Sequence, residues 1–384
     1  MRAVVVGAGA WGLPAALELA DRGHEVSCID RDGPGNPWSS SSGPTRLWRL
    51  ADPDPAAIRL GRRASAALER IEARLGHPVH TRTGLLWRDA PEPLRRITDA
   101  VRGESVAHTD VPAPSVGEVF PGLVADERDA LWLPDAGATL AADLIAGYTR
   151  LLAEAGGTIL TGGEVVAVRT TSGGAAVVLD DGTTLEVDVV VVCAGSGTPA
   201  LLGDLGLAVP LRPFLEQVVH VGHRDDPHAT DAMPCLFDGP GAHGPGIYTM
   251  PTPGVGYKIG FDDPLRELGI GDRDRSPDPD RTRAIVARAD AVLPVAGREV
   301  VDELVCCWTD SADGWFVVDR IGSVVVACGD AGKGFKYSPA IGGILADLAE
   351  GDTPDPDVAA MSAVRFAGRS ADQDWVPTAL GHSA

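Results

Sequence analysis

Three glycines near the start of the chain have the spacing of a dinucleotide-binding turn. Gly7, Gly9 and Gly12 form a G-x-G-x-x-G pattern, and Asp30 closes the next apolar run. In such a turn the first glycine makes the bend, the second lets the backbone approach a pyrophosphate, and the third lets the helix pack on the strand. An acid at position 30 would bind ribose hydroxyls and repel a 2′-phosphate, which disfavours NADP. The pattern does not separate NAD from FAD, and a turn that binds nothing is the alternative.

Basic residues at a few positions are candidates for binding an anion. Arg46 and Arg49, in GPTRLWR, lie three residues apart and would share one side of a helical turn. Lys258 stands among apolar residues in GVGYKIGFD, where lysine is unusual. Lys333 and Lys336 lie in GDAGKGFKYS, ahead of an apolar helix whose N-terminus favours negative charge. The alternatives are that the arginines are solvated or salt-bridged and that Lys258 faces solvent.

The elements around these residues predict an α/β protein. The apolar run 3–6, the helical pattern 13–22 and the apolar run 25–29 form a β-α-β unit around the three glycines. Apolar periodicity predicts further helices at 56–75, 139–156, 281–293 and 340–348. Strands are expected at 164–170, 174–179 and 184–193, with a turn at Asp181-Gly182 between the last two. Residues 262–282 are acidic and proline-rich and are expected to form a surface excursion.

Composition limits the classes of partner. The chain has 384 residues, with 33 basic and 54 acidic side chains, so its net charge is −21. That charge repels nucleic acid and anionic membranes, and no apolar run approaches the roughly 20 residues that span a bilayer. The six cysteines form no C-x-x-C pair, and the nine histidines have no metal-ligand spacing. We therefore expect a cytoplasmic protein that binds no metal, nucleic acid or membrane.

Taken in order, the motifs resemble the sarcosine-oxidase-like branch of the D-amino-acid-oxidase superfamily of FAD enzymes. The resemblance covers nearly the whole chain and is carried by GAGAWG with Asp30, TRLWR, TGLLW, VVVVCAGSGTPALL, GYKIG, VCCWT and GFKYS. It implies an α/β (α+β) fold in which a Rossmann-like FAD-binding domain interleaves with a substrate domain built on a mixed, largely antiparallel sheet. The expected FAD-binding domain comprises residues 1–78, 135–200 and 319–384, and the substrate domain comprises 79–134 and 201–318.

The resemblance also implies roles for single residues. Arg49 and Lys336 align with the pair that grips the substrate carboxylate, and Lys258 aligns with the lysine that activates oxygen. Cys306 aligns with the cysteine that bonds to the 8α carbon of the flavin, the alternative being an ordinary buried thiol. Tyr248 falls near a tyrosine that borders the substrate pocket. The implied cofactor-binding residues are Gly7, Gly9, Gly12, Asp30, Arg31, Thr45, Arg46, Val165, Ala194, Gly195, Cys306, Gly332, Gly334, Phe335 and Lys336.

The implied activity is oxidation of the C–N bond of a secondary amino acid, N-methylated or cyclic, to an imine, with dioxygen reduced to hydrogen peroxide. Two cations on the carboxylate would place the reacting C–H over the flavin, and desolvation would favour the free amine. The first alternative is an FAD-dependent D-amino-acid or imino-acid dehydrogenase with another electron acceptor. An NAD-dependent dehydrogenase and a flavin-binding scaffold without turnover are the others.

Two further positions bear on the substrate. Arg46 aligns with an arginine beside the flavin. Asp262 stands where many sarcosine-oxidase-like enzymes have a histidine that borders the substrate. An acid there would bind a cationic or N–H-bearing group or would face solvent, and either outcome makes sarcosine itself a less suitable substrate. LWRL at 47–50 is similar to secondary-metabolism relatives that oxidise cyclic imino acids, which points to a cyclic secondary amino acid.

Overall fold

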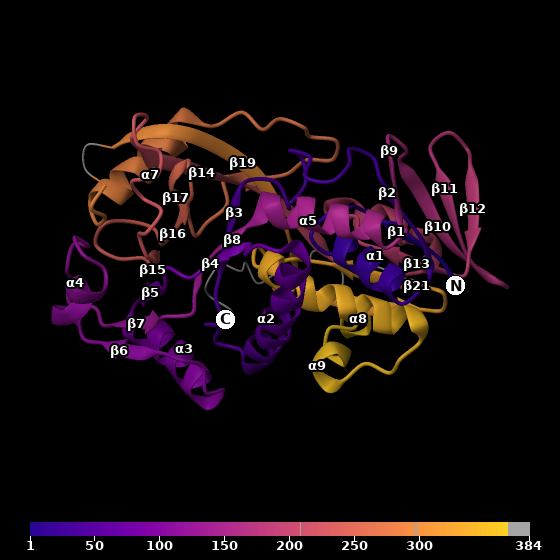
Figure 1. Ribbon diagram of the computed structural model, residues 1–384, viewed down its shortest axis with the longest axis horizontal. Coiled ribbons are helices and arrows are strands. Elements are labelled where there is room, and N and C mark those ends of the chain that lie inside the picture. The colour runs from indigo at the N-terminus through magenta and orange to yellow at the C-terminus, as the bar shows by residue number, and fades with distance from the viewer. Residues whose placement is uncertain (208, 296–297, 368–384) are drawn as a thin grey trace.

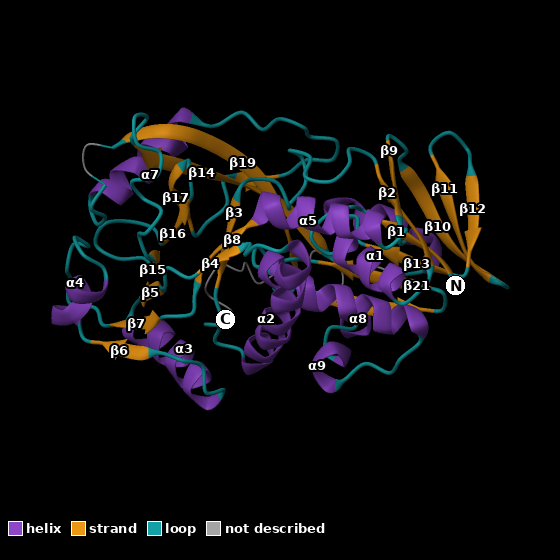
Figure 2. Ribbon diagram, viewed as in Figure 1, coloured by secondary structure: helices purple, strands orange, loops and turns teal. Residues whose placement is uncertain are grey.

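The computed structural model describes residues 1–207, 209–295 and 298–367. A six-stranded sheet in the order β20-β21-β13-β1-β2-β9 forms one half of the molecule (Figures 1 and 2). Its neighbours are parallel except β20, which runs against β21. The strands are β1 (Arg2–Val6), β2 (Glu25–Asp30), β9 (Thr158–Thr161), β13 (Val189–Val192), β20 (Val317–Ile321) and β21 (Val324–Cys328).

Both faces of this sheet are covered, which explains its valine-rich strands. Helices pack on one face, with α1 against α5 and α8, and share a core with Val5, Val191 and Val325. On the other face Val4, Val190 and further apolar residues pack against a three-stranded antiparallel sheet. The elements are α1 (Gly12–Asp21), α5 (Ala141–Glu154), α8 (Ser338–Glu350), β10 (Val165–Thr171), β11 (Gly174–Leu179) and β12 (Thr184–Val187).

A second large sheet forms the other half and is antiparallel throughout except where β5 runs parallel to β15. The mixed, largely antiparallel sheet is therefore confirmed. Its strands are β5 (Leu85–Arg88), β6 (Thr109–Val111), β7 (Ala130–Leu133), β14 (Leu211–Gly222), β15 (Cys235–Asp238), β16 (Ile247–Thr252), β17 (Gly256–Phe261), β18 (Arg266–Glu267) and β19 (Glu299–Ser311). Helices α3 (Pro91–Gly103), α4 (Val116–Val119) and α7 (Pro279–Asp290) accompany it, and the short α6 (Thr198–Leu201) and α9 (Pro356–Ala359) lie elsewhere in the chain.

A small sheet joins the two halves and corrects one expectation. Arg46 lies in β3 (Thr45–Trp48), which pairs with β8 (Gly137–Leu140), while β4 (His80–Thr81) pairs with β8 on its other side. The TRLWR segment is therefore a strand and not a helical turn. Residues three apart in a strand point to opposite faces. This rule does not apply to Arg49, because β3 ends at Trp48.

The predicted helices are confirmed as α2 (Pro55–Leu75), α5, α7 and α8, with ends shifted by a few residues. Helix α2 shows why: Asp54 caps it by accepting a hydrogen bond from Ala56 N, and Gly76 ends it at φ +79°. The single strand expected over 184–193 is wrong. It divides at Asp188, whose carboxylate accepts a hydrogen bond from Arg2 N at 2.7 Å, so β12 joins the hairpin and β13 the parallel sheet. The division into two domains stays a prediction, and the end of its last segment, 368–384, lies outside the described residues.

Candidate active site

A cavity of about 970 Å³ lies between the two large sheets. One wall follows the carboxyl ends of the parallel strands and includes Val6, Asp30 and Cys193. The opposite wall belongs to the antiparallel sheet and includes Lys258 and Cys306. Ligands of open α/β sheets bind at the carboxyl ends of the strands. The position therefore suits a long ligand that reaches from one sheet to the other.

Most of the predicted site residues meet in this cavity. Those in its wall are Gly9, Asp30, Arg31, Arg46, Arg49, Val165, Ala194, Gly195, Tyr248, Lys258, Cys306, Gly332, Gly334, Phe335 and Lys336. Gly7, Gly12, Thr45 and Asp262 do not line it. Of these, Thr45 contacts the cavity wall through its carbonyl oxygen, which accepts a hydrogen bond from Lys258.

The glycine turn is built for close packing. A Cβ on Gly7 would lie 2.3 Å from Cys193 O, and a Cβ on Gly12 would lie 1.9 Å from Gly7 O. Neither position can hold another residue without moving backbone. Gly9 alone of the three lines the cavity, where it leaves the backbone bare for a phosphate.

Asp30 ties this turn to the loop after β2. Its Oδ2 accepts a hydrogen bond from Ala8 N at 2.8 Å, and its Oδ1 accepts from Asp32 N at 2.9 Å and Gly33 N at 2.7 Å. A carboxylate offers about four acceptor positions. Capacity therefore remains for a ribose hydroxyl beside the structural bonds.

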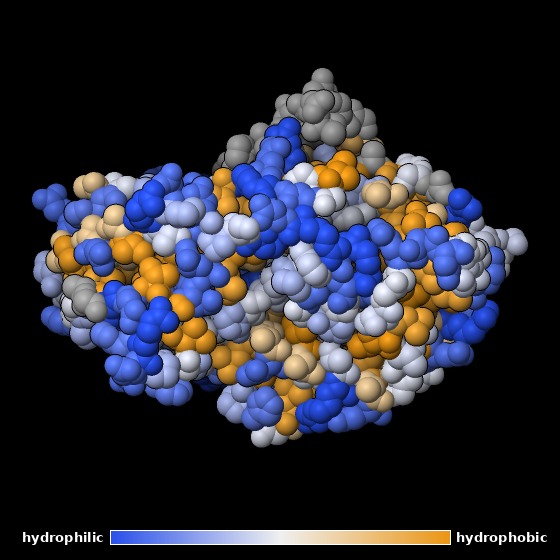
Figure 3. Space-filling model, turned by 90° about the horizontal axis from the view of Figure 1, so that it is seen from above, coloured by the Kyte–Doolittle hydropathy of each residue, from blue (hydrophilic) through white to orange (hydrophobic). Residues whose placement is uncertain are grey.

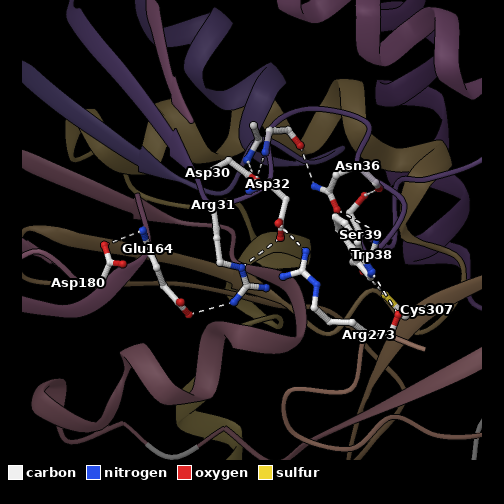
Figure 4. Close-up of polar contacts among 12 residues, drawn as sticks. Asp30, Arg31, Asp32, Asn36, Trp38, Ser39, Glu164, Asp180, Arg273 and Cys307 are labelled. Atoms are coloured by element: carbon white, nitrogen blue, oxygen red, sulfur yellow. Dashed lines mark hydrogen bonds and ion pairs between the residues drawn. The ribbon is translucent and has the colours of Figure 1, made fainter. Parts of the chain in front are cut away.

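Residues 268–275, called the strap here, cross from the antiparallel sheet to the loop after β2 and line the cavity (Figure 4). Arg273 Nη2 lies 2.6 Å from Asp32 Oδ1, and its guanidinium lies 3.6 Å from the centre of the Trp38 ring. Trp38 Nε1 donates a hydrogen bond to Arg273 O at 3.2 Å. The excursion expected over 262–282 is thus partly a cover over the cavity. Figure 3 looks onto this face and shows that hydrophilic residues cover much of it.

Arg49 and Lys336 form a pair of buried cations in the cavity wall, 8% and 5% exposed. Among the described residues, Arg49 Nη1 and Lys336 Nζ have no hydrogen-bond partner. Arg49 Nη1 makes a loose ion pair of 3.8 Å with Asp52, and the guanidinium lies 4.7 Å from the centre of the Trp87 ring. Burial, reinforced by Arg49, holds the pKa of Lys336 well below its usual value. Buried charges require partners, so this end of the cavity is suited to an anion.

Arg46, in contrast, is held by the protein. Its Nη1 donates to Thr45 O at 2.9 Å and its Nη2 to Ser40 O at 3.0 Å. Its guanidinium lies 5.7 Å from the centre of the Phe335 ring. Arg46 therefore supplies a fixed positive charge in the wall and is less suited than Arg49 to gripping a substrate.

Lys258 points into the cavity and not to solvent, since it is 3% exposed. Its Nζ donates a hydrogen bond to Thr45 O at 2.8 Å. Burial, with help from Arg46, lowers the pKa of Lys258 to about 7. Its charge therefore changes near neutral pH.

A chain of hydrogen bonds fixes the residue that holds Lys258. Thr45 Oγ1 lies 2.7 Å from Thr252 Oγ1, which lies 3.1 Å from His220 Nε2. His220 Nδ1 is 3.2 Å from Asp302, a carboxylate near the surface. His220 and Lys258 are also ladder partners on β14 and β17.

Cys306 and Asp262 complete the predicted set. Cys306 is partly exposed in the cavity wall. Cys307 also borders the cavity, but its Sγ donates to Trp38 O at 3.2 Å. Asp262 is 5% exposed, so it does not face solvent. Burial raises the pKa of Asp262 well above its usual range, and the nearby Arg49 opposes that rise.

Three ionisable residues of the site were not predicted from the sequence. Glu216 and Asp330 line the cavity, and His220 supports Lys258 through Thr252. Burial raises the pKa of Asp330 to about 7 while its carboxylate accepts hydrogen bonds from Thr309 N and Gly332 N. Charged residues inside the apolar run LEQVVHV carried the same signal as Lys258 and could have been singled out.

The donors and spaces described above fit FAD. The turn at Gly9 offers backbone to a pyrophosphate, Asp30 offers an acceptor to a ribose, and Cys306 and Lys258 lie in the wall formed by the antiparallel sheet. Among the described residues, no group of three or more histidine, cysteine or acidic side chains could hold a metal ion. Within the same residues, no helix has the length and apolar character needed to cross a bilayer.

Comparisons with known proteins agree with this geometry. The family described as FAD dependent oxidoreductase, DAO, matches residues 2–348. The monomeric sarcosine oxidase of Bacillus sp. (strain B-0618) is 26% identical over 381 residues, covering 94% of each chain. The N-methyl-L-tryptophan oxidase of Citrobacter koseri is 24% identical over 377 residues, covering 94% of this chain and 98% of the relative. The solved L-proline dehydrogenase of P. horikoshii shares the fold with a TM-score of 0.83 at 21% identity, covering 95% and 97% of the two chains.

Proposed function

The chain belongs to the family of FAD-dependent oxidoreductases, and we propose that it oxidises the C–N bond of a secondary amino acid, N-methylated or cyclic, to an imine. Dioxygen is the electron acceptor and becomes hydrogen peroxide. The observation that carries the proposal is the pair of buried cations, Arg49 and Lys336, with unpartnered nitrogens in the wall of the cavity among the described residues. Relatives named for sarcosine and N-methyl-L-tryptophan support the substrate class.

The two cations hold the substrate carboxylate and so orient the carbon next to nitrogen. FAD, when bound, supplies the group that accepts a hydride. Fixing both partners in one geometry removes much of the entropic part of the barrier. The buried wall also disfavours a charged ammonium, so the substrate amine loses its proton before its C–H bond breaks. Tyr248, on β16, lines the cavity and would border the substrate, and Asp262, directly after β17, would adjust the charge around Arg49.

Lys258 serves the second half of the reaction. Electron transfer to dioxygen first creates negative charge on oxygen, and a fixed cation in a dry site stabilises such charge strongly. Lys258 is buried, lines the cavity and is held by Thr45 O. We therefore assign it the role of oxygen activation.

Cys306 is the proposed attachment point of the flavin. Its side chain is the partly exposed thiol in the wall of the antiparallel sheet, whereas the Cys307 thiol is engaged by Trp38 O. A thioether to the flavin 8α carbon would keep the cofactor in place during turnover.

Oxygen uptake with a panel of amines tests the proposal. The holoenzyme is mixed with sarcosine, L-proline, L-pipecolate or D-alanine, and oxygen consumption and peroxide are measured together. We expect at least one secondary amino acid to consume oxygen and yield an equal amount of peroxide. Reduction of an artificial dye acceptor without oxygen uptake would replace the oxidase by a dehydrogenase, and turnover of D-alanine alone would overturn the substrate class.

A further inference from the structure

Glu216 is a buried acid for which the proposed amine oxidation has no use. It lies in β14, is 2% exposed and lines the cavity. Its Oε1 accepts a hydrogen bond from Gln217 N at 2.9 Å and lies 3.4 Å from Arg281 Nη2. Its Oε2 is buried and has no hydrogen-bond partner in the part of the chain that the structure describes. An unpaired buried carboxyl oxygen is costly, which indicates a group that is brought by a ligand.

The position of Glu216 in the sheet indicates where the ligand group beside its Oε2 would lie. Glu216 is the ladder partner of Cys306 on the adjacent strand β19. Opposite residues of an antiparallel pair share one face of the sheet, with Cβ atoms about 4.5–5.5 Å apart. Both side chains line the cavity. Any ligand atom bonded to the Cys306 sulfur is therefore within reach of the Glu216 carboxylate.

We propose that Glu216 is the base that removes a proton from the flavin 8α-methyl group while Cys306 forms its thioether. This inference rests on the covalent attachment proposed above. The chain would then catalyse a second reaction, the covalent attachment of its own flavin. This reaction precedes amine oxidation and is separate from it.

The bonds and electrons of this step balance. One C–H bond of the 8α-methyl group and the S–H bond of Cys306 break, and one C–S bond forms. The two electrons released reduce the flavin ring system, and the two protons leave through Glu216 and the solvent. Dioxygen then takes the two electrons with two protons, which gives one hydrogen peroxide per thioether and restores the oxidised flavin.

Charge around Glu216 predicts how the step depends on pH. Burial raises the pKa of Glu216 well above its usual range, and Arg281 opposes the rise. A base must be ionised, so attachment should accelerate as pH increases. The other ionisable groups around it are Asp263 beside Arg281, Tyr248 on β16, Lys258 on β17 and Cys306 on β19. Cys306 also reacts as its thiolate, so its contribution must be separated by substitution.

Acid-stable flavin, followed in time, tests the inference without reference to turnover. Apoprotein is mixed with FAD in air, samples are precipitated with acid, and yellow pellet is measured against yellow supernatant. The wild type, Glu216→Gln, Cys306→Ser and the control Asp263→Asn are compared. Asp263 also pairs with Arg281 but does not line the cavity, so its substitution reports the loss of a nearby charge alone.

We expect Glu216→Gln to bind FAD and to attach it at least about 100-fold more slowly than the wild type, the usual contribution of a general base. Its rate should also rise less with pH, while Asp263→Asn stays near the wild-type rate. Equal rates for Glu216→Gln and the wild type would overturn the role of Glu216. A colourless wild-type pellet would instead overturn the attachment itself. If Glu216→Gln fails to fold, Glu216→Asp replaces it, with an intermediate rate expected and an unchanged rate contradicting the inference.

Discussion

Arg49 and Lys336 bring two basic groups into the cavity wall, where Arg49 makes a loose ion pair with Asp52 and burial lowers the pKa of Lys336 well below its usual value. Each keeps a nitrogen without a hydrogen-bond partner among the described residues, although both are nearly inaccessible. A charge-assisted hydrogen bond contributes about 1.5–3 kcal/mol. A carboxylate that accepted hydrogen bonds from both free nitrogens would therefore offset part of the cost of burying these groups, which is the physical basis of the carboxylate assignment.

Removing either cation should weaken the reaction with substrate. We expect Arg49→Ala and Lys336→Met each to lower kcat/KM by about 10–100-fold, the equivalent of one lost charge-assisted bond. Steady-state oxygen uptake measures the effect. Arg63→Ala, which removes an exposed arginine paired with Asp355, is the control and should change nothing. Unchanged kinetics in both site variants would remove the carboxylate model.

The charge of Lys258 should control reoxidation. Burial lowers its pKa to about 7, so the ammonium is populated below that pH and lost above it. Only the cation stabilises negative charge on oxygen. The rate constant for reoxidation of the reduced enzyme by dioxygen should therefore fall as pH rises through about 7.

Stopped-flow mixing of reduced enzyme with oxygenated buffers measures this profile. Lys258→Met should be slow at every pH and should lose the transition near neutrality. A wild-type rate constant that is independent of pH, or a fast Lys258→Met variant, would contradict the role in oxygen activation.

Elements of the nucleotide-binding half follow directly from local sequence. Local sequence predicts these elements because each signal spans only a few neighbouring positions. The signals are the glycine spacing, the valine runs and the capping residues of α2. Segments whose form depends on distant partners were harder. TRLW becomes a strand because it pairs with residues 137–140, and LEQVVHVG becomes part of the 12-residue strand β14 because β19 lies beside it. Periodicity within one segment carries no information on such partners.

The function of the strap could not be predicted from the sequence. Its composition indicates exposed loop, yet Arg273 joins it to Asp32 and Trp38, more than 200 residues away in the chain (Figure 4). Arg273→Ala should therefore increase the rates of FAD binding and FAD release by about tenfold each. That change corresponds to an activation barrier lowered by roughly 1.4 kcal/mol. Flavin fluorescence measures both rates in a Cys306→Ser background, with Arg224→Ala as the exposed control. FAD exchange no faster than in the control would mean that the strap does not cover the cofactor.

The cavity draws its walls from both large sheets, so FAD should act as a structural bridge for the molecule as a whole. A ligand that binds only the folded state adds about 2.7 kcal/mol of stability at 100 times its Kd. Apoprotein should accordingly unfold at a lower temperature than holoprotein, and adding FAD to the Cys306→Ser apoprotein should raise the Tm with concentration. Thermal unfolding followed by circular dichroism measures this. A Tm that does not respond to FAD would mean that the folded protein does not bind the cofactor.

The order of the motifs along the chain predicted which distant segments would meet in one site. GAGAWG, GYKIG, VCCWT and GFKYS lie far apart in the chain, and the structure brings their residues Gly9, Lys258, Cys306 and Lys336 into one cavity. Which of the remaining charged side chains would join them depended on register. Glu216 faces Cys306 only because β14 and β19 pair at that position.

We propose that Arg49 and Lys336 recognise a carboxylate and thereby present the C–N bond for oxidation. The most direct measurement compares an active secondary amino acid with its methyl ester under anaerobic conditions, where bleaching of the yellow flavin reports the first half of the reaction alone. We expect the acid to bleach the wild-type flavin rapidly and the ester to do so far more slowly, and we expect Arg49→Ala to react with both at similar rates. An ester that bleaches the wild-type flavin as fast as the acid would show that Arg49 and Lys336 do not recognise the carboxylate.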